Sequence, residues 1–389
     1  MTRFHIAAPE TIKAGKVTDV YFERGLEVLA GRDRDAMVVG EVRVAKLPDG
    51  WNWAVLAGLE EVLELLEDLP VDVKAPPEGT IFGAEEPILS VEGSYRAFGV
   101  YETALLGLLC QASGVATKAA RCKLAADGRP VYSFGARRMH PAISPMIERS
   151  AYVGGCDGVA VGESAALIGE APIGTMAHAL IIVFGDETEV FKAFDEIIDP
   201  AVPRVALVDT FQDEKFGALT AARALGDRLW AVRLDTPRSR RGSFEAILRE
   251  VRWELDLAGH RDVKIFASGG LDEESIASCN PFVDAYGVGT SISNAPVIDF
   301  SFDLVEVDGA PRAKRGKWSG RKELRRCAEC DANAVEPEGS AASQCSCGGR
   351  MEPLTRRFMT AGRKPESYEP ARDIRAHVSS QLGRRSQTL

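Results

Sequence analysis

The sequence predicts an α/β fold, a parallel β/α barrel, joined to a smaller α+β unit. Three observations predict it. Residues 131–290 alternate short apolar strands with helical patterns, as in a parallel sheet covered on both faces. These strands run into clusters of small or polar residues, which is where β/α barrels carry their chemistry. Residues 1–110 instead mix helical periodicity with short segments broken by turn residues.

The N-terminal region supplies the helices and strands of the α+β unit. Residues 54–69 repeat apolar side chains at helical spacing, which predicts an amphipathic helix closed by Pro70. Residues 73–93 alternate and break often, which predicts short antiparallel strands. Residues 101–127 then predict a long helix leading into the barrel.

The barrel region contains seven candidate strands, each with its terminal cluster. They are residues 130–138, 156–164, 170–178, 204–211, 229–237, 263–270 and 284–291. Seven such units fit a barrel better than a doubly wound sheet. Because parallel strands end at one edge, we expect their terminal clusters to share one pocket.

The C-terminal region changes character several times. An alternating segment, residues 302–309, precedes a basic stretch at 313–322 and a cysteine module, and the chain beyond Met351 is polar and charged. We expect this last part to be a surface wrap or partly disordered. The predicted segments are an α+β domain at 1–114 (completed by about 295–325), the barrel at 115–294, the cysteine knuckle at 326–352 and a polar tail at 353–389.

Composition excludes several classes of protein. With 389 residues, 45% hydrophobic and 27% charged, the chain has ordinary globular composition, and its 8 cysteines are too sparse for a disulfide scaffold. No apolar run reaches the length of a membrane helix, and the start lacks a signal-peptide stretch. We therefore expect a cytoplasmic protein with no membrane partner.

The charge distribution argues against nucleic acid as the main partner. Residues 1–310 carry 30 Lys and Arg against 48 Asp and Glu, whereas residues 311–389 carry 17 against 9. The acidic body would repel a phosphate backbone. The basic C-terminal part keeps a weak case for nucleic acid open, or it meets the body of a neighbouring subunit.

Four cysteines have the spacing of a structural zinc site. Cys327 and Cys330 form one close pair, and Cys345 and Cys347 form another fifteen positions later. Four sulfur ligands leave no open position for water, so we expect a structural role for the metal rather than a catalytic one. Disulfides or free thiols are the alternative. Cys110, Cys122, Cys156 and Cys279 lack paired spacing and are interpreted as core thiols.

Two glycine clusters follow the last two candidate strands. Residues 268–270 read Ser-Gly-Gly and residues 287–290 read Gly-Val-Gly-Thr. Glycines let backbone N–H groups approach an anion closely, which is the phosphate grip found after the last strands of many β/α barrels. Each cluster alone is better explained by a tight turn, but the consecutive pair favours phosphate. The sequence contains no Walker-type phosphate loop.

Charged side chains complete the expected rim of the pocket. His178 falls where a strand would pass into a helix, and it acts in chemistry or simply forms a local hydrogen bond. Asp209 and Asp235 end their strands, where they bind a sugar hydroxyl or Mg²⁺ or only cap a helix. Arginine side chains match phosphate or carboxylate oxygens, although each could also form a surface ion pair. Those expected at this rim are Arg137, Arg138 and Arg233.

At this point the sequence resembles the nicotinate phosphoribosyltransferase family, especially its shorter archaeal and bacterial form with a cysteine knuckle. Eight motifs occur in family order over most of the chain. They are TDVYF (18–22), FGARR (134–138), GTMAH (174–178), VDTF (208–211), VRLDT (232–236), ASGGL (267–271), YGVGT (286–290) and AKRGKWSG (313–320).

The resemblance implies a type II phosphoribosyltransferase fold, in which an irregular, incompletely closed β/α barrel packs on an α+β domain built from both chain ends. It implies a homodimer, or a higher assembly, with shared active sites. It also implies synthesis of nicotinate mononucleotide and pyrophosphate from nicotinate and phosphoribosyl pyrophosphate (PRPP), in NAD salvage. Mg²⁺ would accompany PRPP and ATP, and zinc would occupy the knuckle.

The resemblance also implies roles for single residues. The pyridine ring would lie between Phe134 of one subunit and Tyr21 of the neighbouring subunit, and Arg233 would bind its carboxylate. Ser164 would occupy the position at which nicotinamide-specific relatives carry an acidic residue. The residues expected at PRPP, its 5-phosphate, the ribose and Mg²⁺ are Arg137, Arg138, Asp209, Thr210, Asp235, Gly269, Gly270, Gly289 and Thr290. His178 matches the family's phosphorylated histidine, through which ATP hydrolysis is coupled to product formation.

Three rival interpretations stay open at this point. A quinolinate phosphoribosyltransferase would need several basic residues for two carboxylates and would lack the GTMAH histidine. A non-catalytic, nucleic-acid-associated protein would use the cysteine module and basic tail. An aldolase-like or isomerase barrel would want Lys or Glu at a strand end, and Glu163 is the one such residue that these ends offer.

Overall fold

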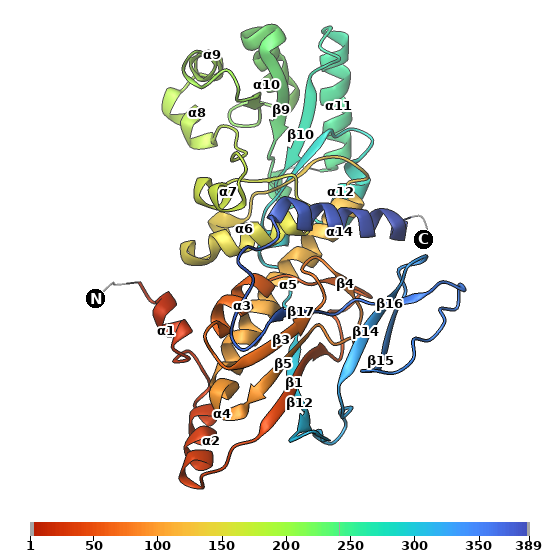
Figure 1. Cartoon of the computed structure of the whole chain (residues 1–389). Coiled ribbons are helices and arrows are strands. Elements are labelled where there is room, and N and C mark those ends of the chain that lie inside the picture. The colour runs from red at the N-terminus through yellow and green to blue at the C-terminus, as the bar shows by residue number, and fades with distance from the viewer. Residues whose placement is uncertain (1–3, 241, 387–389) are drawn as a thin grey trace. The chain divides into compact units, whose positions relative to one another are not determined.

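The computed structural model describes residues 4–240 and 242–386 (Figure 1). The chain forms two compact units. One combines Met1–Thr117 with Pro296–Leu389, and the other is Lys118–Ala295. No helix in the described part of the chain is long and apolar enough to span a lipid bilayer.

The first unit contains a six-stranded sheet with the order β13-β12-β1-β5-β3-β17. Its neighbouring strands pair antiparallel. The strands are β1 (Met37–Val44), β3 (Val71–Ala75), β5 (Leu89–Ser94), β12 (Phe300–Val307), β13 (Ala310–Pro311) and β17 (Arg356–Met359). Both ends of the chain therefore build one sheet, as Figure 1 shows by the red, orange and blue arrows.

Helices α3 (Leu59–Leu66) and α5 (Glu102–Ala125) supply apolar side chains to the core of this unit. Val62, Leu63 and Leu66 belong to the same buried cluster as Val42, Val73 and Val91 of the sheet. Burial of each such side chain contributes about 1.5–3 kcal/mol. The remaining N-terminal elements are α1 (Pro9–Lys13), α2 (Val20–Gly31), β2 (Ala54–Val55), β4 (Ile81–Phe82), α4 (Tyr95–Phe98) and η1 (Gly99–Tyr101).

The helix predicted at residues 54–69 begins later than expected. Ala54–Val55 pair with β4 as strand β2, and Gly58 has a φ of 91°, so it separates strand from helix. A side chain at Gly58 would also lie 2.6 Å from the carbonyl oxygen of Leu108. The apolar residues before Gly58 continue the helical pattern in the sequence, so the pattern does not show where strand β2 ends and helix α3 begins.

The segment after Met351 is more ordered than the predicted polar tail. Strand β17 pairs with β3, and Ala371–Ser386 forms helix α14. Ile374, Val378 and Leu382 are buried at a spacing of four residues, which places one apolar stripe on an otherwise polar helix. The expectation of disorder or a surface wrap is wrong for this segment. The apolar stripe is narrow and lies among many charged residues, so the sequence did not show it as a helix.

A three-stranded sheet, β15-β14-β16, carries the cysteine module of the first unit. Its strands are β14 (Lys322–Cys327), β15 (Asn333–Pro337) and β16 (Met351–Pro353). Helix α14 is tied to this module through two side chains: Arg384 pairs with Asp331, and Gln381 accepts a hydrogen bond from Arg326.

The second unit contains an open parallel sheet with the order β7-β6-β11-β10-β9-β8. The strands are β6 (Val131–Ser133), β7 (Gly158–Val159), β8 (Arg204–Leu207), β9 (Leu229–Leu234), β10 (Lys264–Ser268) and β11 (Ala285–Val288). Among the described residues the edge strands β7 and β8 do not pair with each other. This sheet is the incompletely closed barrel that the resemblance implied.

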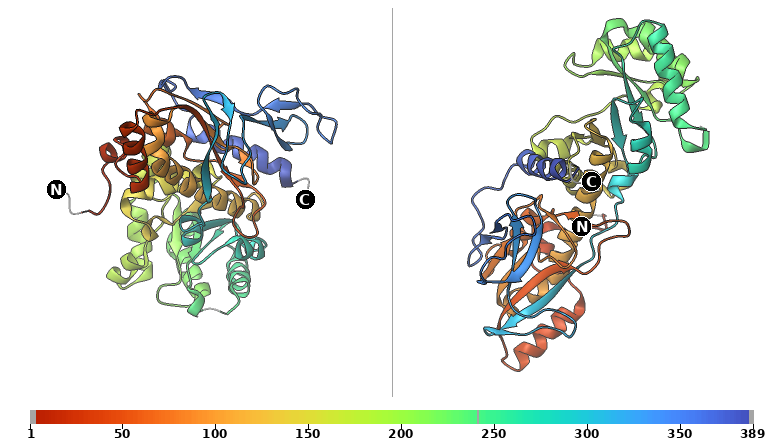
Figure 2. Two further views of the ribbon diagram at one scale, coloured as in Figure 1. Left: turned by 90° about the horizontal axis from the view of Figure 1, so that it is seen from below. Right: turned by 90° about the vertical axis from the view of Figure 1, so that its right-hand side faces the viewer.

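Helices alternate with these strands along the chain. They are α6 (Ser144–Val153), α7 (Gly162–Ile168), α8 (His178–Phe184), α9 (Glu187–Ile197), α10 (Glu214–Leu225), α11 (Phe244–Leu257), α12 (Glu273–Cys279) and α13 (Thr290–Ser293). The short 3₁₀ turns of this unit are η2 (Ala136–Arg138), η3 (Pro141–Ile143), η4 (Gly226–Arg228) and η5 (Arg238–Arg240). Figure 2 shows α8 to α11 beside the strands of this unit, in green.

One of the seven predicted strands is absent. Residues 170–177 form no strand, and their recorded link to the sheet is the hydrogen bond from the Ile173 N–H to the Val159 carbonyl oxygen, 2.8 Å. Pro172 lacks an N–H and Gly174 costs backbone entropy, so this segment is poorly suited to a strand. It forms an irregular loop leading to His178 instead.

Candidate active site

A cleft of about 510 Å³ lies at the carboxyl edge of the parallel sheet. Its walls come from the residues that follow β6, β7 and β9 and from the irregular loop before α8. The lining includes Phe134, Arg137, Ala160, Val161, Thr175, His178, Arg233 and Asp235. Residues from three of the predicted strand-end clusters, those that end segments 130–138, 170–178 and 229–237, therefore do share one pocket, as expected at the carboxyl edge of a parallel sheet.

Phe134 forms an aromatic wall of this cleft. The Phe134 N–H donates to the Val288 carbonyl oxygen at 2.9 Å, which extends the pairing of β6 with β11 and fixes the backbone. Gly287 makes room for the ring, because a Cβ there would lie 2.5 Å from a ring carbon of Phe134. The ring also packs against Phe266 with a centroid separation of 5.7 Å. Its position is thus set by the neighbouring strand β11 and by β10 beyond it.

Arg233 lies over this ring, with 5.3 Å between its guanidinium carbon and the ring centroid. Its Nε donates to Ser268 Oγ at 2.9 Å, and one terminal nitrogen donates to Thr175 Oγ1 at 2.8 Å. The other terminal nitrogen lies 3.3 Å from Asp235 Oδ2. Burial lowers the pKa of Arg233, and the nearby carboxylates oppose that shift. The arginine is therefore a fixed positive charge beside an aromatic face.

His178, at the start of α8, faces two carboxylates. Its Nδ1 lies 3.0 Å from Thr210 Oγ1, while its Nε2 lies 3.6 Å from Asp235 Oδ2 and 4.0 Å from Asp209 Oδ1. The Asp235 N–H and the Thr236 hydroxyl donate to the other oxygen of Asp209, at 2.9 and 3.2 Å. The structure thus brings together the histidine and both aspartates that the sequence singled out.

Asp209 is held in an environment that disfavours its negative charge. Its side chain is only 3% exposed, and burial raises its pKa, although His178 lowers it in turn. Within the described residues its Oδ1 is buried and makes no hydrogen bond. A carboxylate oxygen in this state, next to the Asp235 carboxylate, is a suitable oxygen ligand for a divalent cation such as Mg²⁺.

The two predicted glycine loops end β10 and β11 at the same edge of the sheet. Gly269 and Gly270 have φ values of 88° and 68°, a conformation that favours glycine. A Cβ on Gly269 would lie 3.0 Å from Asp235 Oδ1, so the loop passes close to that carboxylate. Gly289 precedes Thr290, the first residue of α13. Backbone N–H groups are therefore gathered at the ends of β10 and β11, and β11 is the direct neighbour of β6, which precedes Phe134.

Comparison with known proteins follows this geometry. Residues 19–113 match the family model of the quinolinate phosphoribosyl transferase N-terminal domain, and residues 115–303 match that of its C-terminal domain. Nicotinate phosphoribosyltransferase pncB2 of Mycobacterium tuberculosis is 31% identical over 92% of this chain and 84% of its own length. The chain belongs to the nicotinate phosphoribosyltransferase family.

Solved structures show the same fold. A crystal structure of nicotinate-nucleotide pyrophosphorylase from Pyrococcus furiosus is 53% identical, with a TM-score of 0.97 over 99% of both chains. The crystal structure of human nicotinic acid phosphoribosyltransferase matches with a TM-score of 0.77 at 22% identity, over 95% of this chain and 94% of that one, and therefore shows the shared fold. The predicted family and fold are confirmed.

Several residues that the resemblance assigns to the site are not among those that line this cleft. Ser164 is fully buried in α7 and is not among the residues that line the cleft, whereas Ala160 and Val161 are. Arg138 is exposed beside Arg137 in the turn η2, and Arg137 alone of the two lines the cleft. Tyr21 belongs to the first unit, where it lies on α2 with 61% of its surface exposed. Its expected position in a neighbouring subunit stays a prediction.

Three further residues organise the cleft, and the sequence did not single them out. Thr175 and Ser268 both accept hydrogen bonds from Arg233, and Ser268 donates to Asp235 Oδ1 at 2.8 Å. The Thr236 hydroxyl lies within hydrogen-bond distance of both the Asp209 and the Glu214 carboxylate. All three lie inside motifs already noted, GTMAH, ASGGL and VRLDT. Thr236 directly follows Asp235 in the sequence, which was an available signal, whereas Thr175 and Ser268 had no signal beyond their motifs.

The four cysteines of the module converge as predicted. Their sulfur atoms all lie within 4.8 Å of one another, with Cys327 and Cys347 at 3.5 Å and Cys330 and Cys345 also at 3.5 Å. Gly349 allows this approach, because a Cβ there would lie 2.5 Å from the Cys327 sulfur. The Glu329 and Gly349 N–H groups point at two of the sulfurs at 3.4 Å. Such a cluster fits one tetrahedral metal ion, and none of the eight cysteines forms a disulfide.

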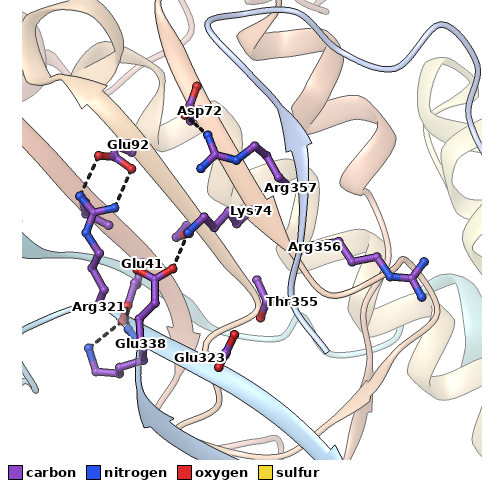
Figure 3. Close-up of a pocket in the computed structure, with 13 residues that line it drawn as sticks. Glu41, Asp72, Lys74, Glu92, Arg321, Glu323, Glu338, Thr355, Arg356 and Arg357 are labelled. Atoms are coloured by element: carbon purple, nitrogen blue, oxygen red, sulfur yellow. Dashed lines mark hydrogen bonds and ion pairs between the residues drawn. The ribbon is translucent and has the colours of Figure 1, made fainter. Parts of the chain in front are cut away.

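A second cavity, of about 130 Å³, lies in the first unit and is lined by charged side chains (Figure 3). Arg321 makes a two-pronged contact with Glu92 and also pairs with Glu306. Further ion pairs join Lys322 to Glu41, Lys74 to Glu338 and Arg357 to Asp72. Since these charges already neutralise one another, the cavity offers no net charge to a ligand. The network instead links the six-stranded sheet to the strands of the cysteine module.

Proposed function

We propose that this chain makes nicotinate mononucleotide and pyrophosphate from nicotinate and PRPP, as a step of NAD salvage. The observation that carries the proposal is Arg233, a fixed guanidinium held over the Phe134 ring beside Asp235 and His178. A planar pyridine acid needs an aromatic face and one bidentate cation for its carboxylate. The relatives named nicotinate phosphoribosyltransferase support the same reaction.

The remaining groups suit the sugar phosphate. Arg137 and the glycine loops after β10 and β11 supply positive charge and backbone N–H donors for its phosphates. Displacement of pyrophosphate passes through an oxocarbenium-like state, so the site must position two reactants and stabilise departing charge. The pyridine nitrogen is already an unprotonated nucleophile at neutral pH. The cleft accordingly needs no strong general base.

We also propose that Asp209 and Asp235 hold Mg²⁺ with PRPP or ATP, and that His178 accepts the γ-phosphoryl group of ATP. In that step an imidazole nitrogen forms the bond to phosphorus, the bond to the bridging oxygen breaks, and ADP leaves. The buried, unbonded Asp209 Oδ1 and the approach of both carboxylates to His178 Nε2 support this assignment. Mg²⁺ would offset the repulsion between phosphate and carboxylates.

The cysteine module is proposed to hold one structural zinc ion. Four sulfurs leave no coordination position for water, so the metal would stabilise the β14–β16 sheet rather than enter the reaction.

A second copy of the chain is proposed to complete the active site with Tyr21. Exposed apolar side chains on α2 and α8, including Val20, Tyr21, Ile182 and Val183, support association of two chains. Mixing inactive Tyr21→Ala and Arg233→Ala proteins should restore activity in heterodimers that carry one intact site. No recovery from stable dimers would contradict a shared site.

Product analysis tests the reaction itself. The purified chain with PRPP and Mg²⁺ should convert nicotinate to nicotinate mononucleotide and pyrophosphate, and should release no CO₂ from quinolinate. Turnover of quinolinate with CO₂ release, or turnover of nicotinamide in preference to nicotinate, would overturn the proposal.

A further inference from the structure

Glu148 on α6 is a buried carboxylate that no step of the proposed reaction uses. It has no exposed surface, and no cation pairs with it among the described residues. A carboxylate in this position is costly unless hydrogen bonds compensate its burial. Burial raises the pKa of Glu148, while hydrogen bonds from the N–H groups of Ala160 and Val161, and the adjacent Ser164 side chain, lower it.

The two oxygens of Glu148 hold the backbone behind one wall of the cleft. Oε1 accepts the Ala160 N–H and Oε2 accepts the Val161 N–H, both at 3.1 Å. These two residues follow β7 and line the cleft on the side of Phe134, since β7 pairs with β6 in the sheet. The glycine loops expected to hold phosphate follow β10 and β11 instead.

The same segment holds the loop that carries Thr175. The Val159 carbonyl oxygen accepts the Ile173 N–H at 2.8 Å. Ile173 also packs against Gly158, where a Cβ would lie 2.6 Å from an Ile173 side-chain carbon. Two residues further on, Thr175 accepts a hydrogen bond from Arg233. A continuous series of contacts therefore runs from Glu148 through β7 to Arg233.

We propose that Glu148 is a positioning residue for the pyridine acid: it clamps the Ala160–Val161 wall, and through Ile173 and Thr175 it fixes Arg233. The inference rests on the proposed function, because it assigns the ring to this side of the cleft. It also gives Ser164 a place behind the wall, next to Glu148, rather than against the substrate.

Glu148→Gln tests the clamp with little change of shape. An amide offers one acceptor oxygen and a donor NH₂, so one of the two backbone N–H groups must lose its partner. We expect the KM for nicotinate to rise at least tenfold, the KM for PRPP to stay within twofold, and kcat to fall less than threefold. Amides of a peptide spanning residues 157–164 should exchange with deuterium at least tenfold faster.

Glu78→Gln is the matched control. Glu78 is another buried glutamate that accepts a backbone N–H, that of Gly58 at 2.9 Å, but it lies in the first unit. Its substitution should lower thermal stability without a selective change in the KM for nicotinate. If Glu148→Gln folds and keeps the KM for nicotinate within twofold of the unmodified chain, the inference is overturned.

Two further measurements keep the test decisive. If Glu148→Gln does not fold, Glu148→Asp keeps the charge but cannot reach both N–H groups, and it should show the same selective rise in KM. An unchanged KM in that variant would overturn the proposal. If the unmodified chain does not turn over nicotinate, the proposed function fails instead. Hydrogen exchange at residues 157–164 then decides by itself whether Glu148 holds the wall.

Discussion

Replacement of Arg233 by lysine is expected to weaken nicotinate binding selectively. A guanidinium has five N–H donors in a rigid fork, and three of its N–H groups are directed at Ser268, Thr175 and Asp235. The remaining donors are available to the substrate carboxylate. Lysine keeps the charge but has three donors on one nitrogen, so it cannot satisfy these partners and also meet a carboxylate with two parallel hydrogen bonds.

The magnitude follows from the contacts that are lost. One charge-assisted hydrogen bond contributes about 1.5–3 kcal/mol. The loss of guanidinium stacking on Phe134, at 5.3 Å, adds roughly 0.5–1 kcal/mol. A total of about 2–4 kcal/mol corresponds to an increase in the KM for nicotinate of roughly 30- to 800-fold.

Initial rates at varied nicotinate and varied PRPP measure this effect. Arg228→Lys is the control, because Arg228 precedes the same strand at its opposite end and is 66% exposed. The KM for PRPP should change little in either variant. The ratio of kcat/KM for nicotinate to kcat/KM for nicotinamide should fall in Arg233→Lys. A KM for nicotinate within twofold of the unmodified chain would refute the role given to Arg233.

Three further predictions concern the core of the first unit, the aromatic wall of the cleft and the cysteine module. Burial, and then the Asp303 carboxylate, raises the pKa of Glu102 from 4.5 to about 7. Between these two pH values the folded chain holds the proton more tightly than the unfolded chain does. The stability of the fold therefore falls as the pH rises through this range. After allowance for solvent screening, Glu102→Gln should be more stable by about 1–2 kcal/mol at pH 8 and equal at pH 4 in thermal melts, whereas an equal gain at both pH values would exclude this titration. Gly287→Ala places a Cβ 2.5 Å from Phe134, so the KM for nicotinate should rise several-fold, while Gly107→Ala, with open space around its Cβ, should not change it. Cys330→Ser should reduce bound zinc, measured by elemental analysis, and lower the melting temperature; full zinc content in that variant would exclude Cys330 as a ligand.

The location of the site could be predicted from the sequence because parallel strands end at one edge. Phe134, His178, Asp209, Arg233 and Asp235 all lie at or next to the ends of apolar segments, and topology alone brings such residues together. The cysteine cluster could also be predicted, because two close cysteine pairs have the spacing typical of a tetrahedral metal site.

Other features depend on contacts that no local pattern reports. The role proposed for Glu148 depends on the contact of α6 with Ala160 and Val161, which follow β7. Ser164 follows a predicted strand, as the resemblance implied, but the helical backbone of α7 turns its side chain into the interior. The segment at 170–177 has the apolar residues of a strand, yet Pro172 and Gly174 leave it irregular. Helix α14 was not predicted because three buried apolar residues pack it against the rest of the first unit, and so few give a weak pattern in the sequence.

The most direct test of the account is the stoichiometry between ATP consumed and nicotinate mononucleotide formed, in the unmodified chain and in His178→Ala. The geometry of His178, Asp209 and Asp235 predicts that ATP stimulates the unmodified chain, with ADP formed along with product. In His178→Ala, product should still form from nicotinate and PRPP, but without ADP and without stimulation by ATP. Equal ATP stimulation in both proteins would contradict the account.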